Sequence, residues 1–247
     1  MSLSDEFARI AEFLANAQAD ELEIKKGLMT PRSKYVEEKS ASIKQEMEEQ
    51  YAKMLRRMSS VGVILEQELN QLPQIEKDHH MGEISFAMKR LLQCKASPDE
   101  LAKETKLLEA NIWQDFLAFS DETLLWIYKI GYRYSEEKKS EEAKALFQLL
   151  VMLNPQVSDY WVALGFVERQ LSEETEALDA FSMASILNPE NPVSRYQSAE
   201  IYLQRGELED ALVELDVLAE IIEKSKLDSL RSELEQLRSK VRSKQLL

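Results

Sequence analysis

The sequence has few of the residues on which most catalytic and metal sites depend. It contains one cysteine and two histidines in 247 residues. A single cysteine, Cys94, cannot form an internal disulfide, which suits a reducing cytosol. His79 and His80 would point about 100° apart on a helix, so we expect a solvated surface patch there rather than a metal pair. Since phosphate-binding, metalloprotease and nucleophile-elbow motifs are also missing, we predict a protein that is not an enzyme and has no metal or cofactor.

Positive charge and long apolar runs are also scarce. The 45 acidic residues outnumber the 31 basic ones and give a net charge of −14, which argues against nucleic-acid binding because phosphates require clustered lysine and arginine. The N-terminal MSLSDEFARI lacks the basic and apolar regions of a secretory signal. No apolar stretch approaches the roughly 20 residues that span a bilayer. We therefore expect a cytoplasmic protein without stable membrane insertion.

Glycine and proline, with six residues each, are too rare for a loop-rich protein. Hydrophobic residues make up 44% of the chain and charged residues 31%, which is typical of helices with densely charged outer faces. Two of the six prolines occur in the same dipeptide, Asn154-Pro155 and Asn188-Pro189, and these dipeptides are 34 residues apart. A helix-ending dipeptide that recurs at a fixed spacing in a helical chain indicates a repeat.

The repeat extends to three more pairs of positions with the same 34-residue offset. The matched pairs are Gly131 and Gly165, Ala143 and Ala177, and Phe147 and Phe181. A weaker third copy follows, with Ala199 and Ala211 in the glycine and alanine positions. This period and residue order are the tetratricopeptide pattern, in which small residues let two antiparallel helices approach and large ones fill the space around them. We predict units at 124–157, 158–191 and 192–225.

Local signals predict where the repeat helices begin and end. Ser140 and Ser172, each followed by two glutamates, are expected to be N-caps of second helices. Asn191-Pro192 is typical of an N-cap followed by a first-turn proline. Asn154 and Asn188 suit left-handed helix ends.

The third unit and the residues after it complete the predicted domain. Gly206 should separate the two helices of unit three. A capping helix is expected at 226–244, with leucine or valine at spacings of three and four. Together these features predict an all-α fold in which residues 120–247 form a right-handed solenoid of three repeats and a cap.

Residues 1–119 show no such period and are predicted to be a separate helical extension. We expect helices at about 4–24, 33–70 and 81–93, and another that starts at the capping box Ser97–Glu100 and runs to about 118. The long helix carries a coiled-coil-like seam that steps by four and three: Met47, Tyr51, Met54, Met58, Val61 and Leu65. Such a seam packs against another helix, either in an intramolecular hairpin or in a homodimer.

The resemblance to tetratricopeptide proteins implies that the first helices of the units line a concave face, with repeat positions two, five, nine, twelve and thirteen pointing into it. This predicts a peptide-binding groove formed by Leu125, Tyr128, Tyr132, Asp159, Val162, Phe166, Arg169, Val193, Tyr196, Glu200 and Leu203. Five of the six residues at positions five and nine are apolar or aromatic, although packing within a unit does not need them there. The groove would hold an extended or helical peptide, or the protein's own residues 1–24.

Three segments of the repeat region resemble the LcrH/SycD family, the class II chaperones of type III secretion translocators. They are LLWIYKIGYRYSEEKKSEEAKALFQLLVMLNP, YWVALGFVERQLSEETEALDAFSMASILNP and AEIYLQRGELEDALVEL. The distinctive features are the Gly131-Tyr132 pair, the number of units, the Ala199-Glu200 pair and the closing helix. The resemblance covers about residues 110–245, and the N-terminal extension departs from the family's short arm.

The resemblance implies a bacterial cytosolic protein that keeps a hydrophobic translocator or effector soluble before export. It implies that an extended client segment lies in the groove, with Tyr128, Tyr132, Val162, Phe166 and Tyr196 as pocket walls. Two other functions remain open. The chain could be a scaffold or adaptor that joins two protein partners, or it could be a structural accessory part of a secretion apparatus.

Overall fold

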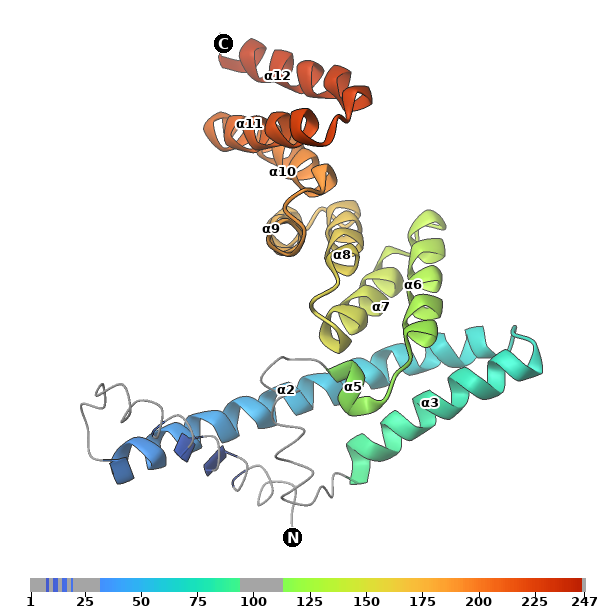
Figure 1. Ribbon diagram of the computed structural model, residues 1–247. Coiled ribbons are helices and arrows are strands. Elements are labelled where there is room, and N and C mark those ends of the chain that lie inside the picture. Colours follow the sequence, from blue (N-terminus) through green and yellow to red (C-terminus); the bar gives the residue numbers. More distant parts are fainter. Residues whose placement is uncertain are drawn as a thin grey trace. The chain divides into compact units, whose positions relative to one another are not determined.

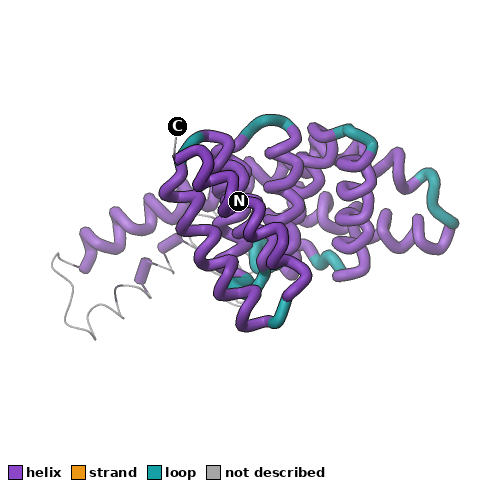
Figure 2. The backbone as a smooth tube through the Cα atoms, turned by 90° about the horizontal axis from the view of Figure 1, so that it is seen from above, coloured by secondary structure: helices purple, strands orange, loops and turns teal. Residues whose placement is uncertain are grey.

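The computed structural model describes residues 8, 11–12, 15–16, 19, 32–93 and 113–245 of the chain. These residues form α-helices, one short 3-10 helix and the turns between them, with no strand in the described ranges (Figure 2). The predicted all-α class is therefore confirmed. The chain divides into two compact units, Met1–Leu124 and Leu125–Leu247. Two features predicted at the N-terminal side, Cys94 and the capping box at residues 97–100, lie outside the described residues, as does most of the helix expected at 4–24.

The first unit contains α2 (Arg32–Leu69), α3 (Gln74–Gln93) and the short α5 (Trp113–Leu117) (Figure 1). The long helix predicted at 33–70 is confirmed. The next helix begins well before the predicted residue 81, because Pro73 starts it: the Pro73 carbonyl accepts the amide of Lys77 at 2.9 Å. The first two turns of α3 are mostly polar, so apolar periodicity gave no signal of them.

The seam of α2 is buried inside the chain. Its described side chains are at most 9% exposed: Tyr51, Met54, Met58, Val61 and Leu65. The side chain of Met47 lies outside the described part. α2 and α3 contact each other along this hairpin (Figure 1). The burial fits the interpretation of the seam as one side of an intramolecular helical hairpin, since a coiled-coil surface kept for another chain would be exposed in one copy.

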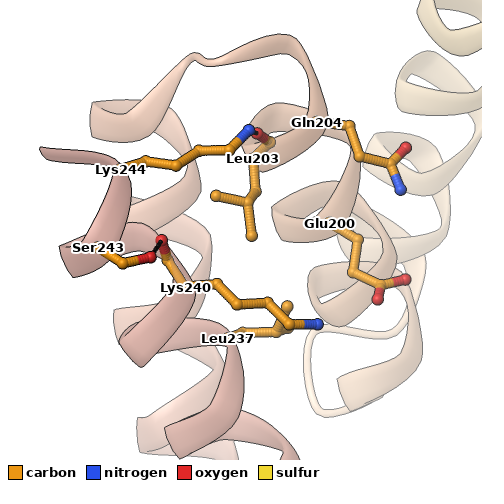
Figure 3. Close-up of a pocket in the computed structure, with 7 residues that line it drawn as sticks. All are labelled: Glu200, Leu203, Gln204, Leu237, Lys240, Ser243 and Lys244. Atoms are coloured by element: carbon orange, nitrogen blue, oxygen red, sulfur yellow. Dashed lines mark hydrogen bonds between the residues drawn. The ribbon is translucent and has the colours of Figure 1, made fainter. Parts of the chain in front are cut away.

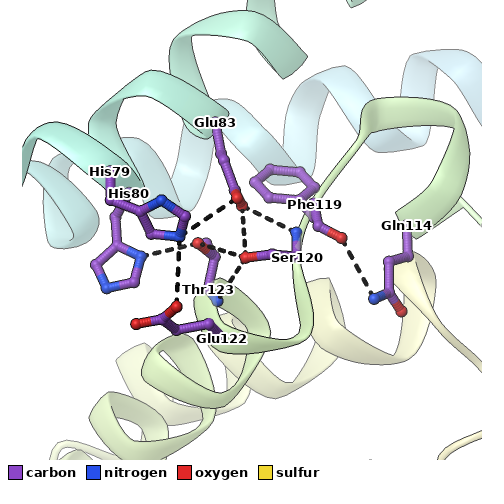
Figure 4. A network of polar contacts seen from close by, with 8 residues as sticks. All are labelled: His79, His80, Glu83, Gln114, Phe119, Ser120, Glu122 and Thr123. Carbon is purple, nitrogen blue, oxygen red and sulfur yellow. Dashed lines mark hydrogen bonds and ion pairs between the residues drawn. The ribbon is translucent and has the colours of Figure 1, made fainter. Parts of the chain in front are cut away.

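A polar network fixes α3 to the residues that lead into the repeats (Figure 4). His80 is 3% exposed, and its Nδ1 lies 2.8 Å from the hydroxyl of Thr123, which is fully buried. The backbone amide and the hydroxyl of Ser120 both donate to Glu83, at 2.9 and 3.1 Å. Burial, reinforced by the neighbouring His79, lowers the pKa of His80. The expectation of a solvated histidine patch is therefore wrong for His80, because the long α3 turns it inward and leaves His79 partly exposed.

The repeats are built from pairs of helices, and consecutive helices from α7 to α12 contact each other. In chain order they are α6 (Asp121–Glu136), α7 (Ser140–Leu153), α8 (Ser158–Gln170), α9 (Glu174–Leu187), α10 (Pro192–Arg205) and α11 (Leu208–Ser225), followed by the 3-10 helix η1 (Asp228–Leu230) and α12 (Arg231–Gln245). The first helix of the first repeat, α6, begins in the first unit, and the others lie in the second; Figure 1 labels α6 to α12. The right-handed solenoid remains a prediction.

Small residues let the paired helices approach closely, as the repeat predicted. A Cβ atom on Gly131 would lie 2.9 Å from the ring of Phe147, and one on Gly165 would lie 2.7 Å from the ring of Phe181. The alanines of the second helices, Ala143, Ala177 and Ala211, are fully buried. The glycines are needed because each phenylalanine ring fills the space in which a side chain would project.

The C-terminal helix closes the second unit. Leu234, Leu237 and Val241 of α12 are at most 5% exposed and form a core cluster with residues of α10 and α11. The α-helix starts at Arg231, later than the predicted residue 226, because Lys226 adopts a left-handed conformation with φ of 55° and ends α11. The predicted capping helix is thus present, but its first residues form η1.

Two predicted serine N-caps are wrong. Ser140 is already the first residue of α7, and no side chain caps that helix. Ser172 has φ of 63° and belongs to the end of α8, because the next amide, that of Glu173, returns to the carbonyl of Glu168 at 2.9 Å. A left-handed residue that ends one helix cannot have the extended backbone that an N-cap requires.

The asparagine predictions had mixed outcomes. Neither Asn154 nor Asn188 is left-handed: their φ angles are −143° and −135°, because the following proline keeps the preceding residue out of the helical region. The predicted N-cap Asn191 is confirmed, since its side chain accepts the amide of Val193 at 2.9 Å. Gly206 is left-handed, with φ of 79°, and separates α10 from α11 as predicted.

Candidate peptide-binding groove

A cavity of about 390 Å³ opens between α6 and α8 in the second unit. Four of the predicted groove residues line it together: Tyr128 and Tyr132 from α6, and Val162 and Phe166 from α8. We refer to it as the aromatic pocket. These residues occupy repeat positions five and nine of the first two units, so one turn of each helix contributes two adjacent side chains.

The aromatic side chains of the pocket are exposed to a degree unusual for their size. Tyr132 is 55% exposed and Phe166 is 37% exposed. Among the other predicted groove residues, Leu125 is 51% and Val193 is 37% exposed. Exposed apolar surface that gathers around a cavity marks a site for a partner more often than scattered single residues do.

The back of the pocket is held by the core. The Tyr128 ring packs edge-on against Phe147 and lies 5.9 Å from the ring of Tyr160, and Phe166 packs edge-on against Phe181. The pKa of Tyr128 is raised by burial and further by the carboxylate of Asp159, so its phenol stays neutral and can donate a hydrogen bond. A ligand would therefore meet walls that are already in place.

One rim of the pocket is polar. Gln170 bridges two helices: its amide donates to the Ser135 hydroxyl at 3.0 Å and accepts from the Ser140 hydroxyl at 2.9 Å. Glu136 and Lys138 also line this side. An apolar side chain can thus enter between the aromatic rings while the backbone of a peptide finds hydrogen-bonding groups at the edge, an arrangement common in binding pockets.

The next part of the predicted groove, between α8 and α10, is polar and internally paired. Arg169 donates to Gln197 and forms an ion pair with Glu200 at 2.8 Å. The hydroxyl of Tyr196 donates to the other oxygen of Glu200 at 3.4 Å. These groups satisfy one another, so this stretch separates the aromatic pocket from the end of the domain instead of extending it.

Leu203 was predicted to point into the groove, but it is 7% exposed and belongs to the C-terminal core cluster, where it lines a separate cavity between α10 and α12. The physical reason is the docking of α12 against α10, which covers the position that the next repeat would otherwise leave open. Sequence reasoning also missed Phe147 as a pocket residue, because the repeat places it in the core. Phe147 is part of the core and, through its contact with Tyr128, also part of the pocket wall.

The described residues show neither a membrane-spanning helix nor a metal-binding cluster. Within the described ranges, no helix has the combination of length and apolarity that crossing a bilayer requires. The same residues contain no group of three or more histidine, cysteine or acidic side chains arranged to hold a metal ion.

Comparison with known proteins finds relatives of about half of the chain, although no family model matches it. It is 27% identical over 123 residues to the low calcium response locus protein H of Yersinia pestis. The aligned residues make up 50% of this chain and 73% of that protein. The same values hold for the protein from Yersinia pseudotuberculosis. The resemblance to the LcrH/SycD family is confirmed. It extends over about half of the chain.

Solved structures with the same fold match a similar part of the chain. The CopN-Scc3 complex matches with a TM-score of 0.50 and 26% identity, over 51% of this chain and 75% of that one. A T3SS complex from Aeromonas hydrophila shares the fold with a TM-score of 0.55 at 24% identity, over 59% of this chain and 98% of that one. The relatives thus match about half of the chain.

Proposed function

We propose that this chain is a cytosolic chaperone of a bacterial type III secretion system that binds a segment of a hydrophobic translocator or effector protein. The observation that carries the proposal is the aromatic pocket, with Tyr132 and Phe166 exposed above a rigid core. The likeness to LcrH and to the CopN-Scc3 complex supports it. The client segment would be extended and would place apolar side chains between α6 and α8.

The pocket suits capture that is specific but reversible. Two or three apolar anchors contribute about 1.5–3 kcal/mol each, and the ordering of the peptide and the loss of free motion offset part of this. The result is roughly micromolar affinity. A carrier of this strength could keep an aggregation-prone client soluble and still release it for export. The net charge of −14 would favour the solubility of the loaded complex.

The test is co-purification from the native bacterium, followed by co-expression. The wild-type chain is compared with the double variant Tyr132→Glu/Phe166→Glu, which places two charges in the aromatic pocket. We expect wild type to retain a protein with long apolar helices and the variant to lose it. The client identified in this way is then co-expressed with each protein, and its soluble fraction is measured.

A matched control is available on helices that do not line the pocket. Ile186 in α9 is 67% exposed and Val213 in α11 is 60% exposed, so Ile186→Glu/Val213→Glu introduces the same charge at apolar surface elsewhere. Circular dichroism should show unchanged helicity for all three proteins. If the pocket variant unfolds, its side chains are core and the groove assignment is wrong. If all three retain the same partners, the pocket is not the working surface.

A further inference from the structure

A second cavity, of about 300 Å³, lies between α10 and α12 at the other end of the second unit. Figure 3 shows Leu203 and Leu237 facing one another across it, with Glu200 and Gln204 on α10 and Lys240, Ser243 and Lys244 on α12. We refer to it as the terminal pocket. Leu203 and Leu237 belong to the C-terminal core cluster, and the other lining side chains are polar or charged.

The terminal pocket is the repeat equivalent of the aromatic pocket. Glu200, Leu203 and Gln204 occupy repeat positions nine, twelve and thirteen of the third unit. Two repeats earlier, the same positions hold Tyr132, Ser135 and Glu136, which line the aromatic pocket. In each case the facing wall comes from the helix that packs beside the first helix of the repeat, α8 in one pocket and α12 in the other. Both cavities therefore open along the face formed by the first helices, and one extended chain could reach both.

The terminal pocket differs from the aromatic pocket in its charge. α12 carries five basic side chains and two acidic ones in a protein whose net charge is −14. Some of its cations are occupied: Arg238 pairs with Asp216 at 2.7 Å, and the Lys244 ammonium donates to the carbonyl of Leu203 at 2.8 Å. Within the described part of the chain, no hydrogen bond or ion pair is found for the Lys240 ammonium.

The single carboxylate of the pocket does not neutralise these lysines. Glu200 is already engaged by Arg169 at 2.8 Å and by the hydroxyl of Tyr196 at 3.4 Å. An apolar floor is present below the cations, since Leu203 is 7% and Leu237 is 1% exposed. The walls thus combine a hydrophobic base with an ammonium group that has room for an anion.

From this arrangement we infer that the terminal pocket binds an acidic side chain of the same extended client segment, next to an apolar residue that rests on Leu203 and Leu237. The inference builds on the proposed function, because the client reaches the pocket along the first-helix face. The Lys240 ammonium pairs with the client carboxylate, and Lys244, held by the α10 carbonyl, keeps the local potential positive. The pocket would fix the register and direction of a segment whose apolar anchors lie between α6 and α8.

The experiment selects peptides from a displayed library of random 16-residue sequences on the full-length chain. Wild type is compared with Lys240→Glu and with Arg242→Glu, a control on the exposed side of the same helix. We expect wild type and Arg242→Glu to enrich peptides with Asp or Glu at a fixed spacing from their apolar anchors. Lys240→Glu should instead enrich Lys or Arg at that position. A synthetic copy of the wild-type peptide should bind Lys240→Glu about tenfold more weakly, and its acid-to-lysine version should restore the affinity.

Each outcome separates this inference from the proposed function. Identical peptides from wild type and Lys240→Glu, lost in Tyr132→Glu/Phe166→Glu, would overturn the terminal pocket and leave the aromatic pocket intact. Peptides that depend on Lys240 but not on Tyr132 and Phe166 would overturn the proposed capture site instead. Loss of a homodimer in Lys240→Glu without a change in the selected peptides would assign the pocket to a second copy of the chain and overturn the inference. If the wild-type chain enriches no peptide, both proposals are overturned.

Discussion

Gly165 of α8 lies directly against the ring of Phe181 of α9, so that a Cβ atom on residue 165 would be 2.7 Å from the ring carbon Cε1. The ring is enclosed by the core, since Phe181 is fully buried. The same relationship joins Gly131 to Phe147 one repeat earlier. This contact determines how closely the two helices of a repeat approach, and the aromatic pocket depends on it because Phe166 packs on the same Phe181 ring.

Gly165→Ala should therefore destabilise the protein even though alanine favours a helix. The gain in helix propensity is about 1 kcal/mol, whereas overpacking a filled core costs about 1–3 kcal/mol. We expect a net loss of about 1 kcal/mol and a lower melting temperature. Gly62→Ala in α2 is the control, because nothing lies within 4 Å of its added Cβ, and it should raise stability. Equal stabilisation by both substitutions would show that the ring can move aside.

The repeat architecture could be predicted because its determinants are local and periodic. A small residue at position eight and a large one at position twenty-four recur with the helices that they join, as Gly165 and Phe181 do. The residues of the aromatic pocket could be predicted from the same period: Tyr128 and Val162 occupy repeat position five, and Tyr132 and Phe166 occupy position nine. Their role as client-binding residues remains a proposal.

What the sequence did not reveal depends on contacts between distant residues. Leu203 has a groove position, but the docking of α12 buries it. His80 is polar and was expected in solvent, but Thr123, 43 residues away, meets it in the interior. Serine is a common N-cap residue, but Ser172 has a left-handed backbone conformation that ends α8. For Leu203 and His80 a local preference was overridden by a packing arrangement that no short window contains, whereas Ser172 is fixed by the local end of α8.

We expect Glu168 to make the stability of the second unit depend on pH. It occupies repeat position eleven, where the other two units have tyrosine, and it is 5% exposed with one carboxylate oxygen lacking a hydrogen bond among the described residues. Burial raises its pKa from 4.5 to about 7, while Lys144 opposes the shift. Because the folded-state pKa is the higher one, the native state binds this proton more tightly. Stability is therefore full below pH 4.5 and declines as the pH rises to about 7.

Glu168→Gln should remove this dependence, because the amide keeps the shape and cannot ionise. We expect the variant to be more stable than wild type at pH 8, by up to about 3 kcal/mol, and close to wild type at pH 4.5. Thermal unfolding of both proteins across this range measures the effect. Glu220→Gln, on the exposed face of α11, is the control and should follow wild type. A variant that is less stable than wild type at every pH would show that the carboxylate is ionised and paired.

Thr123→Val tests the buried link between α3 and the start of α6. Valine retains the shape of threonine but leaves the Nδ1 of His80 without the hydroxyl at 2.8 Å. Loss of one partner of a buried hydrogen bond costs about 1–3 kcal/mol, so the first unit should unfold at a lower denaturant concentration. Thr175→Val, on the exposed face of α9, is the matched substitution and should have little effect. Hydrogen exchange of the α3 amides reports where the loss occurs, and unchanged protection there would contradict the assigned link.

Substitutions in the seam of α2 test whether it is part of the core of one chain or an interface between two chains. Met54 is fully buried and Leu65 is 2% exposed within one chain, so truncating either creates a cavity in the first unit. Met54→Ala should lower the free energy of unfolding by about 2–5 kcal/mol, whereas Val63→Ala, at a position 62% exposed, should lower it by less than about 0.5 kcal/mol. Urea unfolding gives the free energies, and light scattering at the same concentrations gives the oligomeric state. A Met54→Ala protein that unfolds like wild type but changes from dimer to monomer would show that the seam serves a second chain, because a hairpin core would lose stability without a change in mass.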